Sequence, residues 1–244
     1  GLSAAANLAV AGKKVLLLEK HCVPGGYAST FRRGRFEFEI SLHELSGLGH
    51  ADRRGPLYRT LEKCGVAQKV EFLDIPDFYR SLYPDLDLVM PADHAGYDEV
   101  LCEHFPVEKE GIRKYFGQLL NPKKKPAGET EPDKSVGSFL DSIISNDDLK
   151  LILLGNLGYF HDDPYSLSLI YYSVAEGSYY TNGASFIKGG SQRLSDHLAG
   201  YIKSHGGEVL LNRLVTGVKV QAGRATGVTF RRRGGTSQDL EEVM

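Results

Sequence analysis

The hydrophobic pattern at the start of the chain predicts a helix, a turn and a buried strand, in that order. Residues 1–11 are small or apolar with helical spacing, which favours a helix that packs closely on a sheet. Gly12 predicts a turn. Val15–Leu18 places four bulky apolar residues in a row, which is typical of a parallel strand covered on both faces, and Glu19 follows at the strand end. This order predicts the second half of a βαβ unit.

Strand and helix patterns continue along the middle of the chain. Alternation at 35–40 predicts a half-buried strand in a short strand pair, and strands at 69–75 and 78–90, with a turn at Pro84-Asp85, predict an antiparallel second layer. Three prolines make 121–134 a polar break. Helical spacing predicts helices over these ranges: 53–66, 98–105, 108–120, 135–145, 149–154 and 164–176.

The last part of the chain returns to an α/β pattern. We expect a helix with Ser191 as its N-cap that runs to His205 and is ended by Gly206-Gly207. Strands are expected after it at 208–212, 215–220 and 226–231. The predicted fold class is therefore α/β, with antiparallel elements inserted between two α/β segments.

The first residues also carry part of a dinucleotide-binding pattern. The fingerprint G-x-G-x-x-G opens a helix, and an acid about 20 residues further on binds ribose hydroxyls. Gly1 stands where the third glycine belongs, and Glu19 stands at the tip of the second strand. The helix N-terminus stabilises a pyrophosphate, while the carboxylate would repel the 2′-phosphate of NADP. The alternative is an ordinary αβ unit with a solvated Glu19.

Three segments resemble one family. They are "VPGGYAST" (23–30), directly after the ribose acid, "GRFEFEISLHELSG" (34–47), and the run from "KGGSQRL" to "GRATGV" (188–228). They resemble FAD-dependent oxidoreductases of the amine oxidase superfamily, and more closely its phytoene desaturase, carotenoid isomerase and retinol saturase branch. Two glycines in series let the backbone approach a flavin diphosphate where a Cβ would clash. The family's F-D-x-G pattern has Glu39 and Ser41 in place of its Asp and Gly.

The resemblance implies a fold, a cofactor and a set of site residues. It implies an FAD/NAD(P)-binding Rossmann-like domain, incomplete here, with an inserted α+β substrate domain: residues 1–75 and 186–244 form the FAD-binding parts and 76–185 the partial substrate domain. We expect a chain truncated at both ends, because the first strand, the first two glycines and the family's last flavin-contacting segment are absent. His43 is the candidate catalytic residue beside the flavin ring. The implied FAD-binding residues are Gly1, Leu2, Ser3, Glu19, Lys20, Gly25, Gly26, Tyr27, Ala28, Ser29, Thr30 and Val215.

The activity implied by the resemblance is oxidation or reduction of C–C or C=C bonds in a hydrophobic, polyene-like molecule, as a desaturase, saturase or isomerase. Two alternatives remain open: a flavin amine oxidase, and a non-catalytic remnant that keeps the fold without FAD. Tyrosines are dense between Tyr159 and Tyr180. They suit either a substrate pocket with one polar end or ordinary core packing.

The amino-acid composition indicates which classes of partner the chain can bind. The chain has 244 residues, of which 41% are hydrophobic and 25% charged, and a net charge of −2, which argues against nucleic acid as the main partner. Three cysteines without metal-ligand spacing predict free thiols and no metal site. No apolar run approaches the roughly 20 residues of a membrane span, and we expect a cytoplasmic protein. The basic run 123–125 suits a solvated loop better than a contact with anionic lipid headgroups, so this run does not support a peripheral membrane contact, which stays an open alternative. A second redox partner is not identified.

Overall fold

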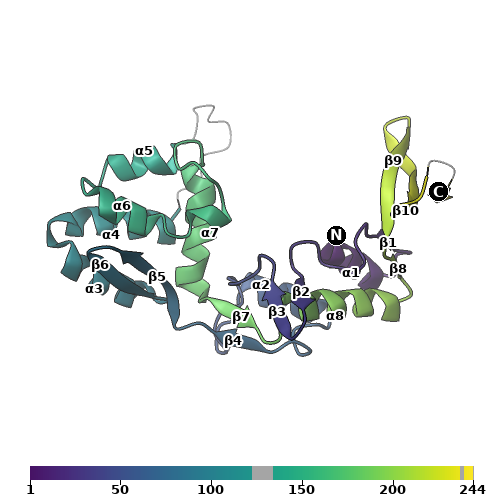
Figure 1. Cartoon of the computed structure of the whole chain (residues 1–244), viewed down its shortest axis with the longest axis horizontal. Coiled ribbons are helices and arrows are strands. Elements are labelled where there is room, and N and C mark those ends of the chain that lie inside the picture. The colour runs from purple at the N-terminus through teal and green to yellow at the C-terminus, as the bar shows by residue number, and fades with distance from the viewer. Residues whose placement is uncertain (123–133, 237–238, 244) are drawn as a thin grey trace. The chain divides into compact units, whose positions relative to one another are not determined.

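The computed structural model describes residues 1–122, 134–236 and 239–243, and these divide into two compact units (Figure 1). Unit 1 comprises 1–43, 58–73 and 186–244, and unit 2 comprises 44–57 and 74–185. The division predicted from the sequence placed 44–57 with the first α/β part, whereas these residues lie in unit 2. The basic run 123–125 lies outside the described residues.

Unit 1 is built on two helices and a short parallel sheet. Helix α1 (Leu2–Val10) leads into strand β1 (Leu16–Leu18), which pairs in parallel with β8 (Glu208–Leu210). Helix α8 (Ser191–Ser204) packs beside α1, whose buried face consists of Ala5, Ala6 and Ala9. These small side chains let the helix backbone approach its neighbours closely. The predicted parallel strand is confirmed, although its three residues are half-buried rather than covered on both faces.

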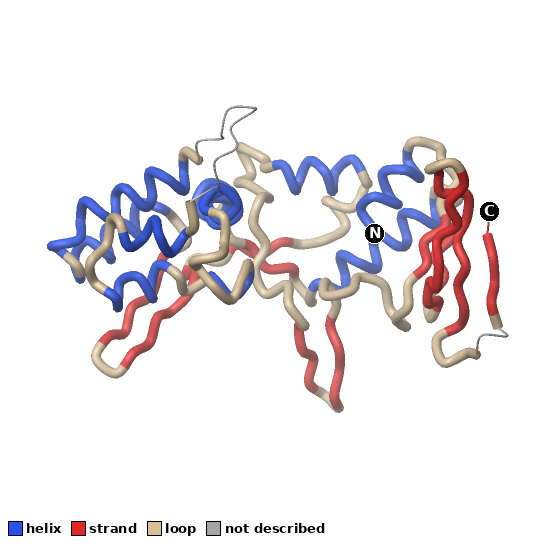
Figure 2. The backbone as a smooth tube through the Cα atoms, turned by 90° about the horizontal axis from the view of Figure 1, so that it is seen from above, coloured by secondary structure: helices blue, strands red, loops and turns tan. Residues whose placement is uncertain are grey.

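Antiparallel strands complete unit 1. Strands β9 (Arg213–Gln221), β10 (Arg224–Arg232) and β11 (Leu240–Val243) form a three-stranded sheet in the order β11-β10-β9. Strand β11 has no signal in the sequence, because its residues Leu-Glu-Glu-Val lie in a polar terminal stretch. Strands β2 (Thr30–Arg33) and β3 (Phe36–Glu39) form a hairpin whose turn projects at the lower centre of Figure 2 and whose base is bonded to the start of α8.

Three short elements lie where the chain passes between the units. Helix α2 (Pro56–Lys63) contains one of these crossings, and strands β4 (Phe72–Asp74) and β7 (Ser185–Ile187) contain two others.

Unit 2 is a hairpin covered by helices. Strands β5 (Asp77–Tyr83) and β6 (Leu86–Pro91) are antiparallel and turn at Pro84-Asp85, as predicted. The remaining elements are α3 (His94–His104), the 3-10 turn η1 (Pro106–Glu108), α4 (Lys109–Leu120), α5 (Val136–Asp141), α6 (Asp147–Leu153), the 3-10 turn η2 (Leu157–Tyr159) and α7 (Leu169–Asn182). Tyr97, Tyr115 and Tyr172 lie fully buried in its core. The Tyr115 and Tyr172 hydroxyls both lie 3.1 Å from the carbonyl oxygen of Leu153.

Two helix starts differ from the prediction. The helix expected at 164–176 begins at Leu169, because Ser168 accepts the N–H of Tyr171 and caps it there. Helix α8 has Gly190, at φ +84°, as its N-cap, whereas Ser191 is its first helical residue. The prediction of Ser191 as the cap is wrong because its hydroxyl bonds a carboxylate on β3 instead of its own helix.

Candidate cofactor-binding site

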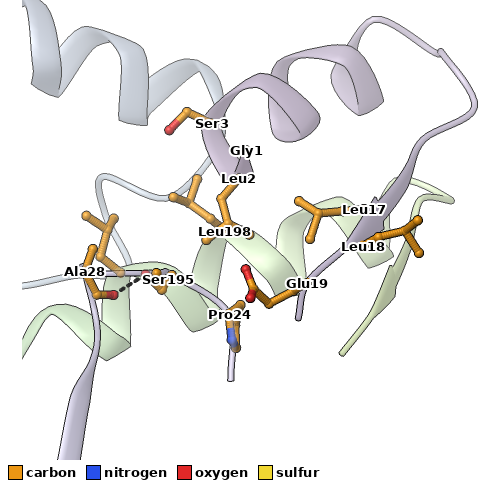
Figure 3. Close-up of a pocket in the computed structure, with 13 residues that line it drawn as sticks. Gly1, Leu2, Ser3, Leu17, Leu18, Glu19, Pro24, Ala28, Ser195 and Leu198 are labelled. Atoms are coloured by element: carbon orange, nitrogen blue, oxygen red, sulfur yellow. Dashed lines mark hydrogen bonds between the residues drawn. The ribbon is translucent and has the colours of Figure 1, made fainter. Parts of the chain in front are cut away.

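A hollow of about 390 Å³ in unit 1 brings together residues from three parts of the chain (Figure 3). The first part is the N-terminus of α1, the second is the end of β1 with the loop after it, and the third is α8. The lining residues are Gly1, Leu2, Ser3, Leu17, Leu18, Glu19, Pro24, Gly25, Gly26, Ala28, Leu194, Ser195 and Leu198.

Glu19 is held at the tip of β1 by backbone bonds on both sides. Its N–H donates to the carbonyl of Leu210, 2.9 Å away, and its carbonyl accepts the N–H of Arg213 at 2.8 Å. Its side-chain Oε1 accepts the N–H of His21 at 2.7 Å, which orients the carboxylate. In Figure 3 this carboxylate points into the hollow. A carboxylate fixed in this way is suited to accept hydrogen bonds from a ribose diol.

The start of α1 forms the second wall. Gly1 is the N-cap and provides no side-chain hydrogen bond to the helix. The first-turn N–H groups of a helix lack intrahelical acceptors, and the helix dipole adds partial positive charge at this end. The Gly1–Ser3 end of α1 therefore offers donors for a phosphate, only a short span from the carboxylate that would bind the ribose.

The double-glycine loop forms the third wall. Gly25 and Gly26 have φ angles of +123° and +62°. A Cβ on Gly25 would lie 2.4 Å from the carbonyl oxygen of Ala28 and 2.5 Å from Oγ of Ser195, so this position accepts only glycine. A Cβ on Gly26 would meet nothing within 4 Å, so Gly26 is required by its backbone angle and faces open space.

Helix α8 holds this loop in place. The Ser195 hydroxyl donates to the carbonyl of Ala28 at 2.7 Å, and the Gln192 amide donates to the carbonyl of Pro24 at 3.1 Å. Within the loop, the Ser29 hydroxyl donates to the carbonyl of Gly26 at 2.7 Å. Leu194, Ser195 and Leu198 line the hollow and were not predicted as site residues. A signal was present: two serines four residues apart lie on the apolar stripe of α8, where a small hydroxyl suggests a partner outside the helix.

The start of α8 is in turn bonded to β3. The Ser191 N–H donates to Oε2 of Glu39 at 2.8 Å, and its hydroxyl bonds Oε1 of the same carboxylate. Glu39 stands where the resembling family has Asp, and the longer side chain reaches the helix N-terminus. A carboxylate at this position also interacts favourably with the helix dipole.

The other predicted FAD-binding residues lie around the hollow rather than in its wall. Lys20 is exposed, and Tyr27 is 80% exposed. The Thr30 hydroxyl bonds Glu37 across the hairpin at 3.3 Å. Val215 lines a neighbouring hollow with Leu16 and Leu18, and Leu18 contributes to both hollows.

The His43 imidazole makes no hydrogen bond or ion pair with the residues that the structure describes. Its backbone N–H donates to the carbonyl of Ser41 at 2.9 Å, and its side chain is exposed. Its assignment as a catalytic residue stays a prediction. Among the described residues, no group of three or more His, Cys, Asp or Glu side chains could hold a metal ion, and none of the helices is long and apolar enough to cross a membrane.

Unit 2 contains a buried acid of its own. Glu176 is 1% exposed and accepts hydrogen bonds from the Asn156 amide at 3.0 Å and the Tyr180 hydroxyl at 3.2 Å. Burial raises the pKa of its carboxyl to about 7. Burial also raises the pKa of Glu44, on another segment of the unit, to about 7. Tyr172 lies in the hydrophobic core of the unit, so core packing accounts for this tyrosine, whereas Tyr180 also lines a hollow of about 270 Å³.

The hollow in unit 1 fits the adenosine diphosphate end of a dinucleotide. The N-terminus of α1 and the Gly25-Gly26 loop would hold the phosphates, and Glu19 would hold the ribose. A Cβ at Gly25 would clash with the atoms that pack against this loop, so the loop requires glycine there. When bound, a flavin supplies hydride transfer. The protein's own residues bind and orient it.

Comparison with known proteins agrees with this geometry. The chain is 27% identical over 257 residues to prolycopene isomerase 2, chloroplastic, of an Oncidium hybrid cultivar, which covers 93% of this chain and 43% of that protein. It is 25% identical to all-trans-retinol 13,14-reductase of Danio rerio, covering 94% of this chain and 42% of that protein. It is also 25% identical to phytoene desaturase (neurosporene-forming) of Rhodobacter capsulatus, covering 93% and 47%. The chain thus spans less than half the length of these curated relatives.

Solved structures show the same fold. An oxidoreductase from Methanosarcina mazei superposes with a TM-score of 0.74 at 17% identity, over 99% of this chain and 54% of that one. Rab GDI from Plasmodium falciparum superposes with a TM-score of 0.55 at 11% identity, over 99% of this chain and 61% of that one. The predicted fold class, an incomplete FAD-binding α/β domain with an inserted domain, is confirmed by the first of these and by a family model that matches residues 1–242. That model describes the flavin containing amine oxidoreductases, and the chain belongs to this family.

Proposed function

We propose that this chain is part of an FAD-dependent oxidoreductase that acts on C–C or C=C bonds of a hydrophobic, polyene-like substrate. FAD as the cofactor is supported by one observation: Glu19, the Gly25-Gly26 loop and the start of α1 line the same hollow. A ribose acceptor, a close backbone approach and phosphate donors are the three parts of a dinucleotide site. The substrate class is supported by the relatives, whose names refer to carotenoid and retinoid reactions.

The flavin is tested by titrating FAD into the purified chain and following flavin absorbance and fluorescence. We expect a yellow complex and a Glu19→Gln variant that binds FAD roughly tenfold more weakly or worse, because the variant loses a charge-assisted bond to the ribose. Glu62→Gln, an exposed acid of the same unit outside the hollow, is the matched control and should bind FAD as the unchanged chain does. A colourless chain without affinity for FAD would favour the reading as a non-catalytic remnant.

The substrate class is tested on the full-length gene product that contains this chain, with FAD bound. We expect anaerobic addition of a polyene, or of a retinoid, to change the flavin spectrum and to yield a product with an altered number or geometry of double bonds. The family description also names amines. Hydrogen peroxide formed from amines, with no reaction of polyenes, would establish the amine oxidase alternative instead.

A further inference from the structure

The β2–β3 hairpin has two chemically different faces. Residues opposite each other across the two strands are Phe31 and Phe38, and Arg33 and Phe36. Because side chains alternate along a strand, the three phenylalanines and Ile40 share one face. Their exposed fractions are 41% for Phe31, 57% for Phe36, 45% for Phe38 and 41% for Ile40. We call this the aromatic face, and its rings of Phe31 and Phe38 stack at 5.1 Å.

The opposite face of the hairpin is occupied within the protein. Arg32 makes a salt bridge of 2.7 Å with Glu37, and Thr30 bonds the same acid. Glu39 accepts the N–H of Ser191 at the start of α8. The hairpin is therefore anchored by its polar face, and the aromatic face is left to solvent.

Two arginines add positive charge to the aromatic face without a compensating acid. The Arg33 guanidinium lies 5.4 Å from the centre of the Phe31 ring, and that of Arg35 lies 5.1 Å from the centre of the Phe36 ring. Neither makes a salt bridge with any described residue. The acids of β3 alternate onto the polar face, so the aromatic face is apolar at its centre and cationic toward the turn.

We propose that the aromatic face docks on a membrane surface that carries anionic lipids. Phenylalanines can enter the boundary between headgroups and acyl chains, while the two guanidinium groups bind the phosphate and carboxylate of the headgroups. An anionic bilayer supplies negative charge opposite Arg33 and Arg35, neither of which makes a salt bridge with a described residue. In a symmetric pairing of two copies through this face, the guanidinium groups of Arg33 and Arg35 from the two copies would repel one another. The proposal does not depend on the proposed reaction.

Vesicle co-sedimentation tests the docking. We expect the chain to pellet with vesicles of phosphatidylcholine and phosphatidylserine in equal parts, and far less with phosphatidylcholine alone. Arg33→Glu/Arg35→Glu should weaken binding to the anionic vesicles by roughly tenfold or more, and Phe36→Ser/Phe38→Ser should do the same. Two matched controls should bind normally: Lys13→Glu/Lys14→Glu, which makes the same charge change on an exposed turn, and Leu82→Ser/Val89→Ser, which removes exposed apolar side chains from the β5–β6 hairpin.

A fluorescence experiment reports the contact directly. The chain has no tryptophan, so Phe36→Trp introduces a single reporter at the aromatic face. Its emission should shift to shorter wavelength on adding anionic vesicles and be quenched by brominated acyl chains. Leu82→Trp, on the other hairpin at 68% exposure, should show neither change.

Several results would overturn the proposal. They are failure of the unchanged chain to pellet with anionic vesicles, equal binding by the Arg33→Glu/Arg35→Glu variant, and a Phe36→Trp emission that vesicles leave unchanged. Sedimentation velocity adds one more: a dimer that Phe36→Ser/Phe38→Ser converts to monomer would assign the face to self-association. The charge-reversal variant keeps the phenylalanines, and its thermal unfolding should match that of the unchanged chain, so a lost contact is distinguished from a lost fold.

Discussion

Replacing Gly25 with alanine tests the close packing between the double-glycine loop and α8. The new Cβ would lie 2.4 Å from the carbonyl oxygen of Ala28 and 2.5 Å from Oγ of Ser195, which are the two atoms joined by the 2.7 Å hydrogen bond that holds the loop. The carbonyl belongs to the backbone and cannot rotate away. The loop must therefore shift, and this hydrogen bond must break.

The cost follows from two contributions. Holding alanine at φ +123° costs on the order of 1–3 kcal/mol, and loss of the Ser195 hydrogen bond costs about 1 kcal/mol. We expect the free energy of unfolding to fall by about 2–4 kcal/mol. The FAD dissociation constant should rise by roughly tenfold or more, because the displaced loop no longer meets the phosphates.

Urea unfolding followed by circular dichroism, together with FAD titration, measures both effects. Gly12→Ala is the matched control, since Gly12 has φ +69° but no atom within 4 Å of a Cβ and lies outside the hollow. It should lose only about 1–2 kcal/mol and keep its affinity for FAD. Adding Ser195→Ala to Gly25→Ala removes the contact with Oγ but not the one with the carbonyl, so it should not restore binding. Equal stability and equal FAD affinity of Gly25→Ala and Gly12→Ala would refute the reasoning.

Three further predictions concern stability and reactivity. Burial raises the pKa of the Glu176 carboxyl in the folded protein to about 7 from its ordinary 4.5. Between these two pH values the folded state holds a proton that the unfolded state has released. The contribution of this group to the free energy of unfolding should therefore be greatest below pH 4.5 and fall as the pH rises through 7. Glu176→Gln should remove part of that slope in urea unfolding at several pH values, while the part from Glu44 remains, and an unchanged slope would contradict the assignment. Of the cysteines, exposed Cys22 should react with a thiol reagent before unfolding and buried Cys64 only after it, which mass spectrometry of the labelled chain can check. Glu39→Ala should lower the free energy of unfolding by about 1–3 kcal/mol in urea, because α8 loses a carboxylate that accepts its first N–H, and no change would contradict this role.

Local patterns predicted the α/β frame of unit 1 well. The apolar run before Glu19 favours a short strand, which the structure shows as half-buried, and the glycines after it favour a tight loop, so both were predictable from adjacent residues. The turn at Pro84-Asp85 was predictable for the same reason. These features depend on backbone preferences that neighbouring residues determine.

Features that depend on distant partners were not predictable. Serine is a residue type that favours helix N-caps, but the Ser191 hydroxyl and N–H both donate hydrogen bonds to the carboxylate of Glu39, more than a hundred residues away in the sequence. Ser195 and Leu198 enter the hollow because α8 packs against α1; the serines on the apolar stripe indicated some partner, but no local pattern identifies that partner. The family resemblance implied Val215 as an FAD-binding residue, and the structure places it in the adjoining hollow. Its role in FAD binding stays a prediction.

Helix α8 connects two surfaces that differ in their chemistry. Its first residue is tied to Glu39 on the hairpin, and one turn later Ser195 is tied to the loop beside Gly25. The hairpin and the backbone that faces the cofactor hollow are thus bonded to the same turn of helix, and the loop also runs directly into β2 at Thr30. A change that moves the start of α8 would therefore be expected to affect both the hairpin and the loop beside the hollow.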